Sequence, residues 1–155
     1  MLTQALSMDF NSEKLKKFDG TTVYAINKRH QVIMMEELAK ENPKVFFSSM
    51  HPGWADTPAV RSAMPGFYAK MKNNLRSPEE GADTAIFLAI SPSALKFPSG
   101  KFFQDRLPVD VHLPLAWTKY TDDEAKEFMT KLDHLAQKFK DSSSVTVEKE
   151  AEENP

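Results

Sequence analysis

The chain has 155 residues, of which 41% are hydrophobic and 27% are charged, a composition typical of one soluble globular domain. Twenty basic and twenty-two acidic side chains give a net charge of -2, so no strong overall field favours nucleic acid or anionic lipid as a partner. The longest apolar run covers residues 85–90, whereas a membrane-spanning helix needs about 20 apolar residues. The absence of cysteine and of a signal-peptide pattern predicts an intracellular, cytoplasmic protein.

The first predicted element is a helix over residues 23–40, where apolar and charged side chains mix without glycine or proline. Asn42-Pro43 ends this helix. Residues 45–50 are rich in β-forming side chains and are followed by Pro52-Gly53, which predicts a strand buried on both faces. A helix, a short turn and an apolar strand are half of a βαβ crossover, so the predicted class is α/β with a parallel sheet.

Proline and glycine interrupt residues 54–74, which predicts a lid or binding loop containing broken helix. The sequence Ser77-Pro78-Glu79-Glu80 is a helix-start signal for a helix that continues to about Ile90. A turn and a second strand are expected over residues 99–104.

A last helix is expected to begin after Thr121, because Thr121 and Glu124 form a capping pattern. Its apolar side chains recur at alternating four and three residues, which favours docking on the protein's own sheet over a coiled coil. Residues 1–140 are expected to form the folded domain, and residues 141–155 an acidic disordered tail. The apolar stripe of the last helix consists of Phe128, Leu132, Leu135 and Phe139.

Tyr24 and Lys28 lie four residues apart on the first helix and therefore share one face. An adjacent ammonium stabilises a phenolate, which makes such a tyrosine a candidate general acid or base near neutral pH. Tyr68 and Lys72 have the same spacing. We interpret the second pair as accidental, because no buried strand follows it to fix its geometry.

The setting of the first pair points to a known family. The segment Tyr24-Ala25-Ile26-Asn27-Lys28 is followed by a strand, by Pro-Gly-Trp-x-x-Thr-Pro over residues 52–58, and by Ser-Gly-Lys-Phe-Phe over residues 99–103. This succession resembles the C-terminal half of the short-chain dehydrogenase/reductase family. Residues 18–24 and 48–58 resemble one subgroup of that family in particular.

The resemblance implies the C-terminal part of a Rossmann-type doubly wound parallel sheet, with the cofactor half on the N-terminal side missing. It also implies that Tyr24 exchanges a proton with the oxygen of a carbonyl or alcohol, and that Lys28 supports this exchange and hydrogen-bonds the nicotinamide ribose. The cofactor would be NAD or NADP. The implied cofactor-binding residues are Tyr24, Lys28, Pro52, Gly53, Trp54, Ala55 and Thr57.

The substrate implied by the resemblance is a hydrophobic carbonyl or alcohol compound, because apolar side chains occupy the family's variable substrate loop. These side chains are Met64, Phe67, Tyr68 and Met71.

Several features of the family are missing from the sequence. The five glycines never form the Gly-x-x-x-Gly-x-Gly turn that holds a pyrophosphate. Ser12 precedes Tyr24 at close to the family's separation, but the neighbouring residues suggest that the catalytic serine lies before Met1. We therefore expect a truncated form of low or no activity. The alternative is a noncatalytic fragment or splice product that pairs with another copy or subunit through an exposed sheet edge.

The remaining candidate residues point less clearly to a function. Trp54 fits either a core aromatic under the loop or a residue beside the cofactor. His51 is expected to be a hydrogen-bonded structural histidine, because the four histidines show neither metal-ligand spacing nor a nucleophile motif. A hydrolase is not supported either, since no Gly-x-Ser-x-Gly sequence is present.

Overall fold

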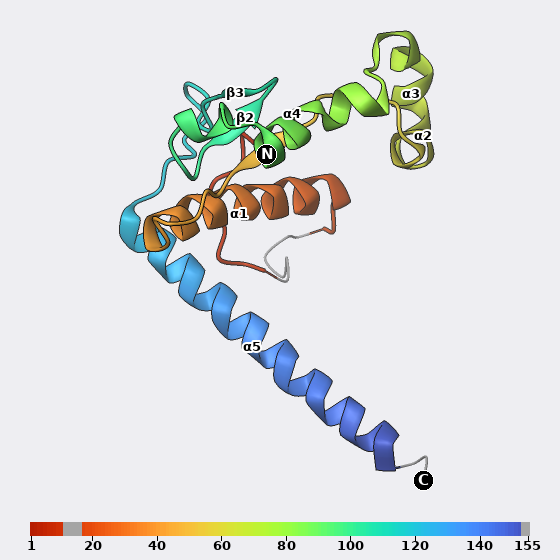
Figure 1. The fold of residues 1–155 in the computed structure, drawn as a ribbon. Helices are drawn as coiled ribbons and strands as arrows, with labels where there is room; N and C mark the ends of the chain where they lie inside the picture. Colours follow the sequence, from red (N-terminus) through yellow and green to blue (C-terminus); the bar gives the residue numbers. More distant parts are fainter. Residues whose placement is uncertain (11–16, 153–155) are drawn as a thin grey trace.

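A computed structural model of the chain describes residues 1–10 and 17–152, with side chains up to Lys140. A helical layer packs against a small sheet, and one long helix projects from this body (Figure 1). Ser12 lies outside the described residues. In chain order the elements are α1 (Gly20–Glu41), β1 (Ser49–His51), α2 (Pro58–Ala63), α3 (Pro65–Met71), the 3₁₀ turn η1 (Lys72–Asn74), α4 (Pro78–Ile90), the 3₁₀ turn η2 (Ala94–Lys96), β2 (Phe102–Gln104), β3 (Leu107–Pro108) and α5 (Asp122–Glu152).

The sheet contains three strands in the order β1-β2-β3. β1 and β2 are parallel, with Met50 opposite Phe103, as expected for an α/β crossover. β2 and β3 are antiparallel. The predicted α/β class is therefore confirmed, whereas the expectation of a wholly parallel sheet is wrong. The physical reason is the two-residue turn Asp105-Arg106, in which both residues have positive φ (52° and 65°), the geometry of a tight hairpin.

The first strand is shorter and less covered than predicted. It begins at Ser49 instead of Val45, and Val45 is 51% exposed. Met50 is half-buried and His51 is exposed, so the expectation of burial on both faces is wrong. The faces of a strand are covered by the layers packed on the sheet, and a strand of three residues offers little area for such packing.

The helix starts follow local signals in the sequence. Asp19 caps α1 by accepting a hydrogen bond from the Thr21 amide at 3.1 Å, which places the start three residues before the predicted one. Ser77 and Glu80 form the expected capping box of α4. The broken helix expected over residues 54–74 is also present, as α2, α3 and η1.

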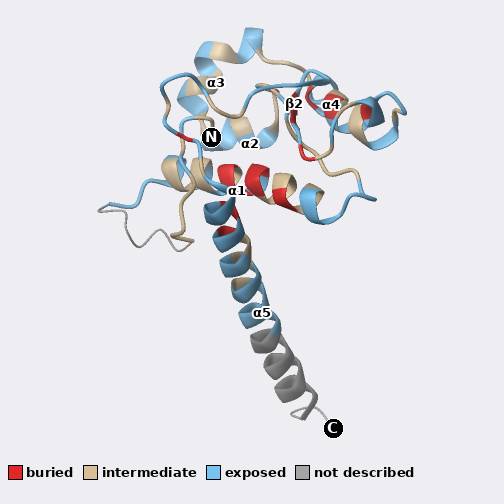
Figure 2. Ribbon diagram, turned by 90° about the vertical axis from the view of Figure 1, so that its left-hand side faces the viewer, coloured by how far each residue is buried: buried red, intermediate tan, exposed pale blue. Residues whose placement is uncertain are grey.

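The long helix α5 packs against α1 and not against the sheet, which corrects the sequence-based expectation. Ile33 of α1 and Ala125 and Phe128 of α5 form a fully buried cluster. Buried residues lie where α1 meets the first turns of α5, and others lie on β2 and α4 (Figure 2). Further along the predicted stripe Phe139 is 65% exposed. The backbone of α5 continues to Glu152, and the tail boundary at residue 141 stays a prediction, because no side chain beyond Lys140 is described.

Arg29 of α1 forms hydrogen bonds to the loop that precedes α5. Its guanidinium is fully buried and donates to the carbonyl oxygens of Val111 at 2.7 Å and Thr118 at 3.2 Å, and to Nδ1 of His112 at 2.8 Å. These bonds close the loop at both ends. In the part of the chain that the structure describes, no helix is long and apolar enough to cross a membrane.

Candidate active site

The direction of α1 places the start of this helix beyond the carboxyl end of β1. The last part of α1 packs on Gly100, where a Cβ atom would lie 3.0 Å from the Cβ of Ala39, just before β2 begins. Tyr24 lies fifteen residues earlier on α1, which is about 22 Å along the helix axis. α1 and β1 run in opposite directions (Figure 1). Tyr24 and the loop after β1 therefore lie at the same end of the layers, where ligands of α/β sheets usually bind.

Tyr24 and Lys28 are neighbours on an exposed face of α1, as predicted. The Nζ atom of Lys28 lies 5.6 Å from the centroid of the Tyr24 ring. Tyr24 is 64% exposed, and Lys28 donates a hydrogen bond to Oε1 of Gln31 at 3.0 Å. The pair is open to a ligand. Its chemical role stays a prediction.

The Pro52–Thr57 loop begins with a turn that requires glycine. Gly53 has φ +74°, a left-handed conformation that side-chain-bearing residues rarely adopt. Its amide donates to Nδ1 of His51 at 2.9 Å, so His51 is held as a hydrogen-bonded residue. Burial, and then the positive charge of Arg76, lower the pKa of His51.

The remaining loop residues have local structural contacts. Thr57 caps α2, with its Oγ1 accepting from the Val60 amide at 3.3 Å. Ala55 is buried against Gly81 of α4. Trp54 is 49% exposed and packs on Phe67 of α3 with the ring centroids 4.5 Å apart. Trp54 is thus not a core residue, and its ring connects the Pro52–Thr57 loop to α3.

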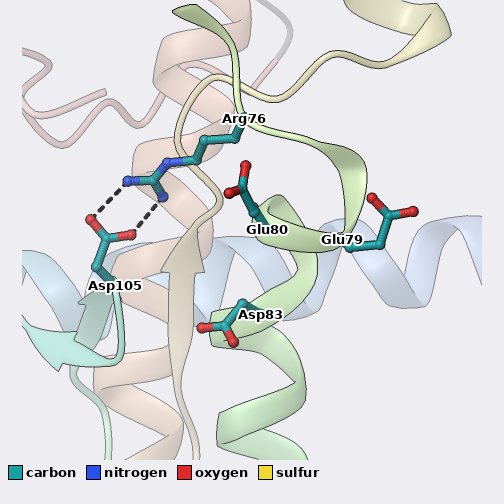
Figure 3. Close-up of a pocket in the computed structure, with 5 residues that line it drawn as sticks. All are labelled: Arg76, Glu79, Glu80, Asp83 and Asp105. Carbon is teal, nitrogen blue, oxygen red and sulfur yellow. Dashed lines mark hydrogen bonds and ion pairs between the residues drawn. The ribbon is translucent and has the colours of Figure 1, made fainter.

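Sequence reasoning missed Arg76, which lies between η1 and α4 and contacts the Pro52–Thr57 loop from there. Its side chain donates to the Pro52 carbonyl oxygen and forms a two-point ion pair with Asp105 (Figure 3). The Arg76 guanidinium lowers the pKa of the Asp105 carboxyl. An open pocket of about 510 Å³ lies beside this pair and is lined by Arg76, Glu79, Glu80, Asp83 and Asp105. An exposed arginine before a helix cap carries no sequence signal for such a contact.

The second tyrosine–lysine pair lies in a different setting. Tyr68 of α3 faces the guanidinium of Arg61 at 5.6 Å. Arg61 in turn pairs with Asp56 and lowers the pKa of that carboxyl. These contacts tie α2 and α3 to the loop and give Tyr68 a packing role.

The residues gathered at this end of the layers could hold the nicotinamide half of a dinucleotide. The exposed phenol of Tyr24, the ammonium of the partly buried Lys28 and a loop with a left-handed glycine can meet a nicotinamide ring and its ribose. The sequence has no glycine-rich turn for the pyrophosphate. In the ranges covered by the structure, no group of three histidine, aspartate or glutamate side chains could hold a metal ion.

Comparison with known proteins supports the resemblance seen in the sequence. The chain is 51% identical to Dehydrogenase/reductase SDR family member 12 of Homo sapiens and 49% identical to that of Bos taurus, over 140 residues in each case. The matches cover 90% of the chain and 44% of each relative. Carbonyl reductase (NADPH) 1 of Rattus norvegicus is 36% identical over 67 residues, which are 43% of the chain and 21% of that relative. No protein-family model matches the chain.

Proposed function

The chain is homologous to the short-chain dehydrogenase/reductase family, and from this premise we propose that it forms the nicotinamide-facing part of an oxidoreductase. The reaction interconverts a carbonyl and an alcohol with NAD or NADP. The chain spans less than half the length of the SDR family member 12 relatives it matches. The doubly wound Rossmann-type sheet is part of this proposal and would be completed outside the described strands. A cytoplasmic location, expected from the composition, also belongs to it.

The observation that carries the proposal is the Tyr24–Lys28 pair, with Nζ 5.6 Å from the ring, at the end of the layers where the Pro52–Thr57 loop begins. In the reducing direction, the Tyr24 hydroxyl gives its proton to the carbonyl oxygen of the substrate, and in the oxidising direction the phenolate takes it back. The Lys28 ammonium would supply the positive charge beside the Tyr24 ring and would hydrogen-bond the ribose. When bound, the nicotinamide supplies or accepts the hydride.

The loop after β1 would hold the nicotinamide ring and its carboxamide. The residues that would contribute backbone groups, together with the Thr57 hydroxyl, are Pro52, Gly53, Trp54, Ala55 and Thr57. The partly buried lid side chains Met64, Phe67, Tyr68 and Met71 favour a hydrophobic carbonyl or alcohol compound as the substrate. The name of the rat relative, a carbonyl reductase that uses NADPH, supports the same substrate class.

The absence of a glycine-rich turn from the sequence limits what this chain does alone. We expect low or no turnover, and dinucleotide binding well below ordinary dehydrogenase affinity, because nothing in the sequence cradles the pyrophosphate. A noncatalytic fragment is the second candidate. It is favoured by β1, which has a strand neighbour on one edge only within the described residues and so offers the other edge to another chain or copy.

A nuclear magnetic resonance titration of the chain with nicotinamide mononucleotide tests this proposal. Adenosine monophosphate is the matched control ligand. We expect shifts at the amides of residues 24–28 and 53–57 with the nicotinamide ligand, at a dissociation constant on the order of millimolar. Adenosine monophosphate should leave these amides unchanged.

Two variants locate the contact. Lys28→Met should weaken binding about fivefold, the loss of one charge-assisted hydrogen bond. Lys72→Met removes the lysine of the other pair and should leave binding unchanged. Equal responses to both mononucleotides, or none at residues 53–57, would contradict the proposal and favour the noncatalytic fragment.

A further inference from the structure

Arg76 lies outside the Pro52–Thr57 loop and forms hydrogen bonds to the backbone of three of its residues. The Nη1 atom of Arg76 donates to the Pro52 carbonyl oxygen at 3.2 Å. The Arg76 amide donates to the Trp54 carbonyl oxygen at 2.9 Å, and the Asp56 amide donates to the Arg76 carbonyl oxygen at 2.8 Å. Arg76 thus contacts the loop through both its side chain and its backbone.

The same guanidinium lies against Gly53. A Cβ atom built on Gly53 would be 2.8 Å from Nη1 and 2.9 Å from both Cζ and Nε of Arg76. The guanidinium therefore occupies the space that a side chain at position 53 would fill. Gly53 is needed here twice, for its φ of +74° and for this close approach.

Asp105 keeps the guanidinium in this position. Its two carboxylate oxygens accept from Nη1 at 2.5 Å and from Nη2 at 2.9 Å, a two-point geometry that only arginine can form (Figure 3). Asp105 itself lies in the strained hairpin turn between β2 and β3. The next residue of this turn, Arg106, forms a separate ion pair with Asp83 of α4.

We propose that Arg76, oriented by Asp105, is a positioning residue that holds the Pro52–Thr57 loop in the conformation that receives the nicotinamide. This inference rests on the proposed function of that loop. Arg76 does not touch the reacting atoms. Its side chain fixes the backbone at Pro52 and Gly53, and its own backbone bonds Trp54 and Asp56. Loss of the side chain releases the start of the loop from the position in which it would meet the ring.

Three variants test the inference, with nicotinamide mononucleotide as the probe. Arg76→Ala removes the side-chain contacts. Arg76→Lys keeps the charge but loses the two-point pair and the flat contact with Gly53. Arg106→Ala is the matched control, because it breaks a comparable exposed two-point pair in the same hairpin turn, and the described hydrogen bonds and ion pair of Arg106 go to Asp83 and Thr84 rather than to the loop. Hydrogen–deuterium exchange at the amides of residues 53–56 and the dissociation constant of the probe are measured for each variant.

Arg76→Ala should speed amide exchange in residues 53–56 about tenfold and raise the dissociation constant at least about fivefold. Arg76→Lys should resemble Arg76→Ala, because geometry and not charge is the property required. Arg106→Ala should change neither quantity by more than about twofold, although the melting temperature should fall by a similar amount for both alanine variants.

The outcomes separate the two claims. Binding of the probe by the unaltered chain together with unchanged binding and exchange in Arg76→Ala would overturn the inference and leave the proposed function standing. Full binding by Arg76→Lys would reduce the role of Arg76 to its charge and would also overturn the inference. A failure of the unaltered chain to respond at residues 53–57 would remove the proposed function and, with it, the role assigned to Arg76.

Discussion

Lys28 holds its ammonium 5.6 Å from the centre of the Tyr24 ring, one helical turn along α1. The arrangement leaves the Tyr24 hydroxyl open, since 64% of this residue is exposed. A substrate oxygen can therefore approach the hydroxyl, as the proposed proton exchange requires.

Tyr24→Phe is expected to separate chemistry from binding. In any form of the protein that reduces carbonyl compounds, it should lower kcat by about 100-fold or more, because the proton donor is lost. The dissociation constant for the nicotinamide ligand should stay within about twofold, since the ring that faces Lys28 remains. Single-turnover kinetics and a binding titration measure the two quantities. Unchanged kcat would remove Tyr24 from the mechanism.

Gly53→Ala is expected to lower the free energy of unfolding by more than about 1 kcal/mol. The added methyl group meets the Arg76 guanidinium at 2.8 Å, and alanine disfavours a φ of +74°. Gly66→Ala is the matched control, because a Cβ atom at Gly66 in α3 meets nothing within 4 Å. It should be neutral or slightly stabilising. Urea unfolding of both variants decides the matter, and equal effects would show that the turn at Gly53 is not constrained as described.

Arg29→Ala is expected to destabilise the fold by about 3 kcal/mol, because it leaves the carbonyl oxygens of Val111 and Thr118 without their buried donor. Arg61→Ala breaks an exposed ion pair with Asp56 and should cost less than about 1 kcal/mol. Urea midpoints of the two variants give the comparison. A loss for Arg29→Ala no larger than that for Arg61→Ala would contradict the anchoring role of Arg29.

His30 should make the protein less stable in mild acid. Burial lowers the pKa of His30 below its ordinary 6.5, although the ring Nε2 bonds to the Ser7 carbonyl oxygen at 2.7 Å. The unfolded chain therefore binds a proton at a higher pH than the folded chain does. Stability falls as the pH drops through 6.5 toward the lower pKa of the folded protein, and it is fully present above 6.5.

The pKa values of His51 and His112 are also lowered, with burial as the first cause, so the measured slope includes all three histidines. His30→Gln should reduce the loss of urea midpoint between about pH 7.5 and about pH 5.5. An unaltered pH dependence in this variant would show that His30 does not contribute to the slope.

The sequence predicts those parts of the fold that depend on neighbours in the chain. The capping box at Ser77 and Glu80 and the turn before β2 are local, and both are present. The partner of α5 was missed, because an apolar stripe shows that a face is buried but not what covers it. The same holds for β1, whose extent depends on strands beside it. Arg76 escaped notice because its contacts lie 24 and 29 residues away in the chain.

The central claim is that Tyr24 and the loop after β1 face one and the same nicotinamide ring. Intermolecular nuclear Overhauser effects from the ring protons of bound nicotinamide mononucleotide test it directly. The account predicts transfer both to the aromatic protons of Tyr24 and to the amide protons of residues 53–57 in a single complex. Transfer to only one of these segments, with none to the other at saturating ligand, would contradict it.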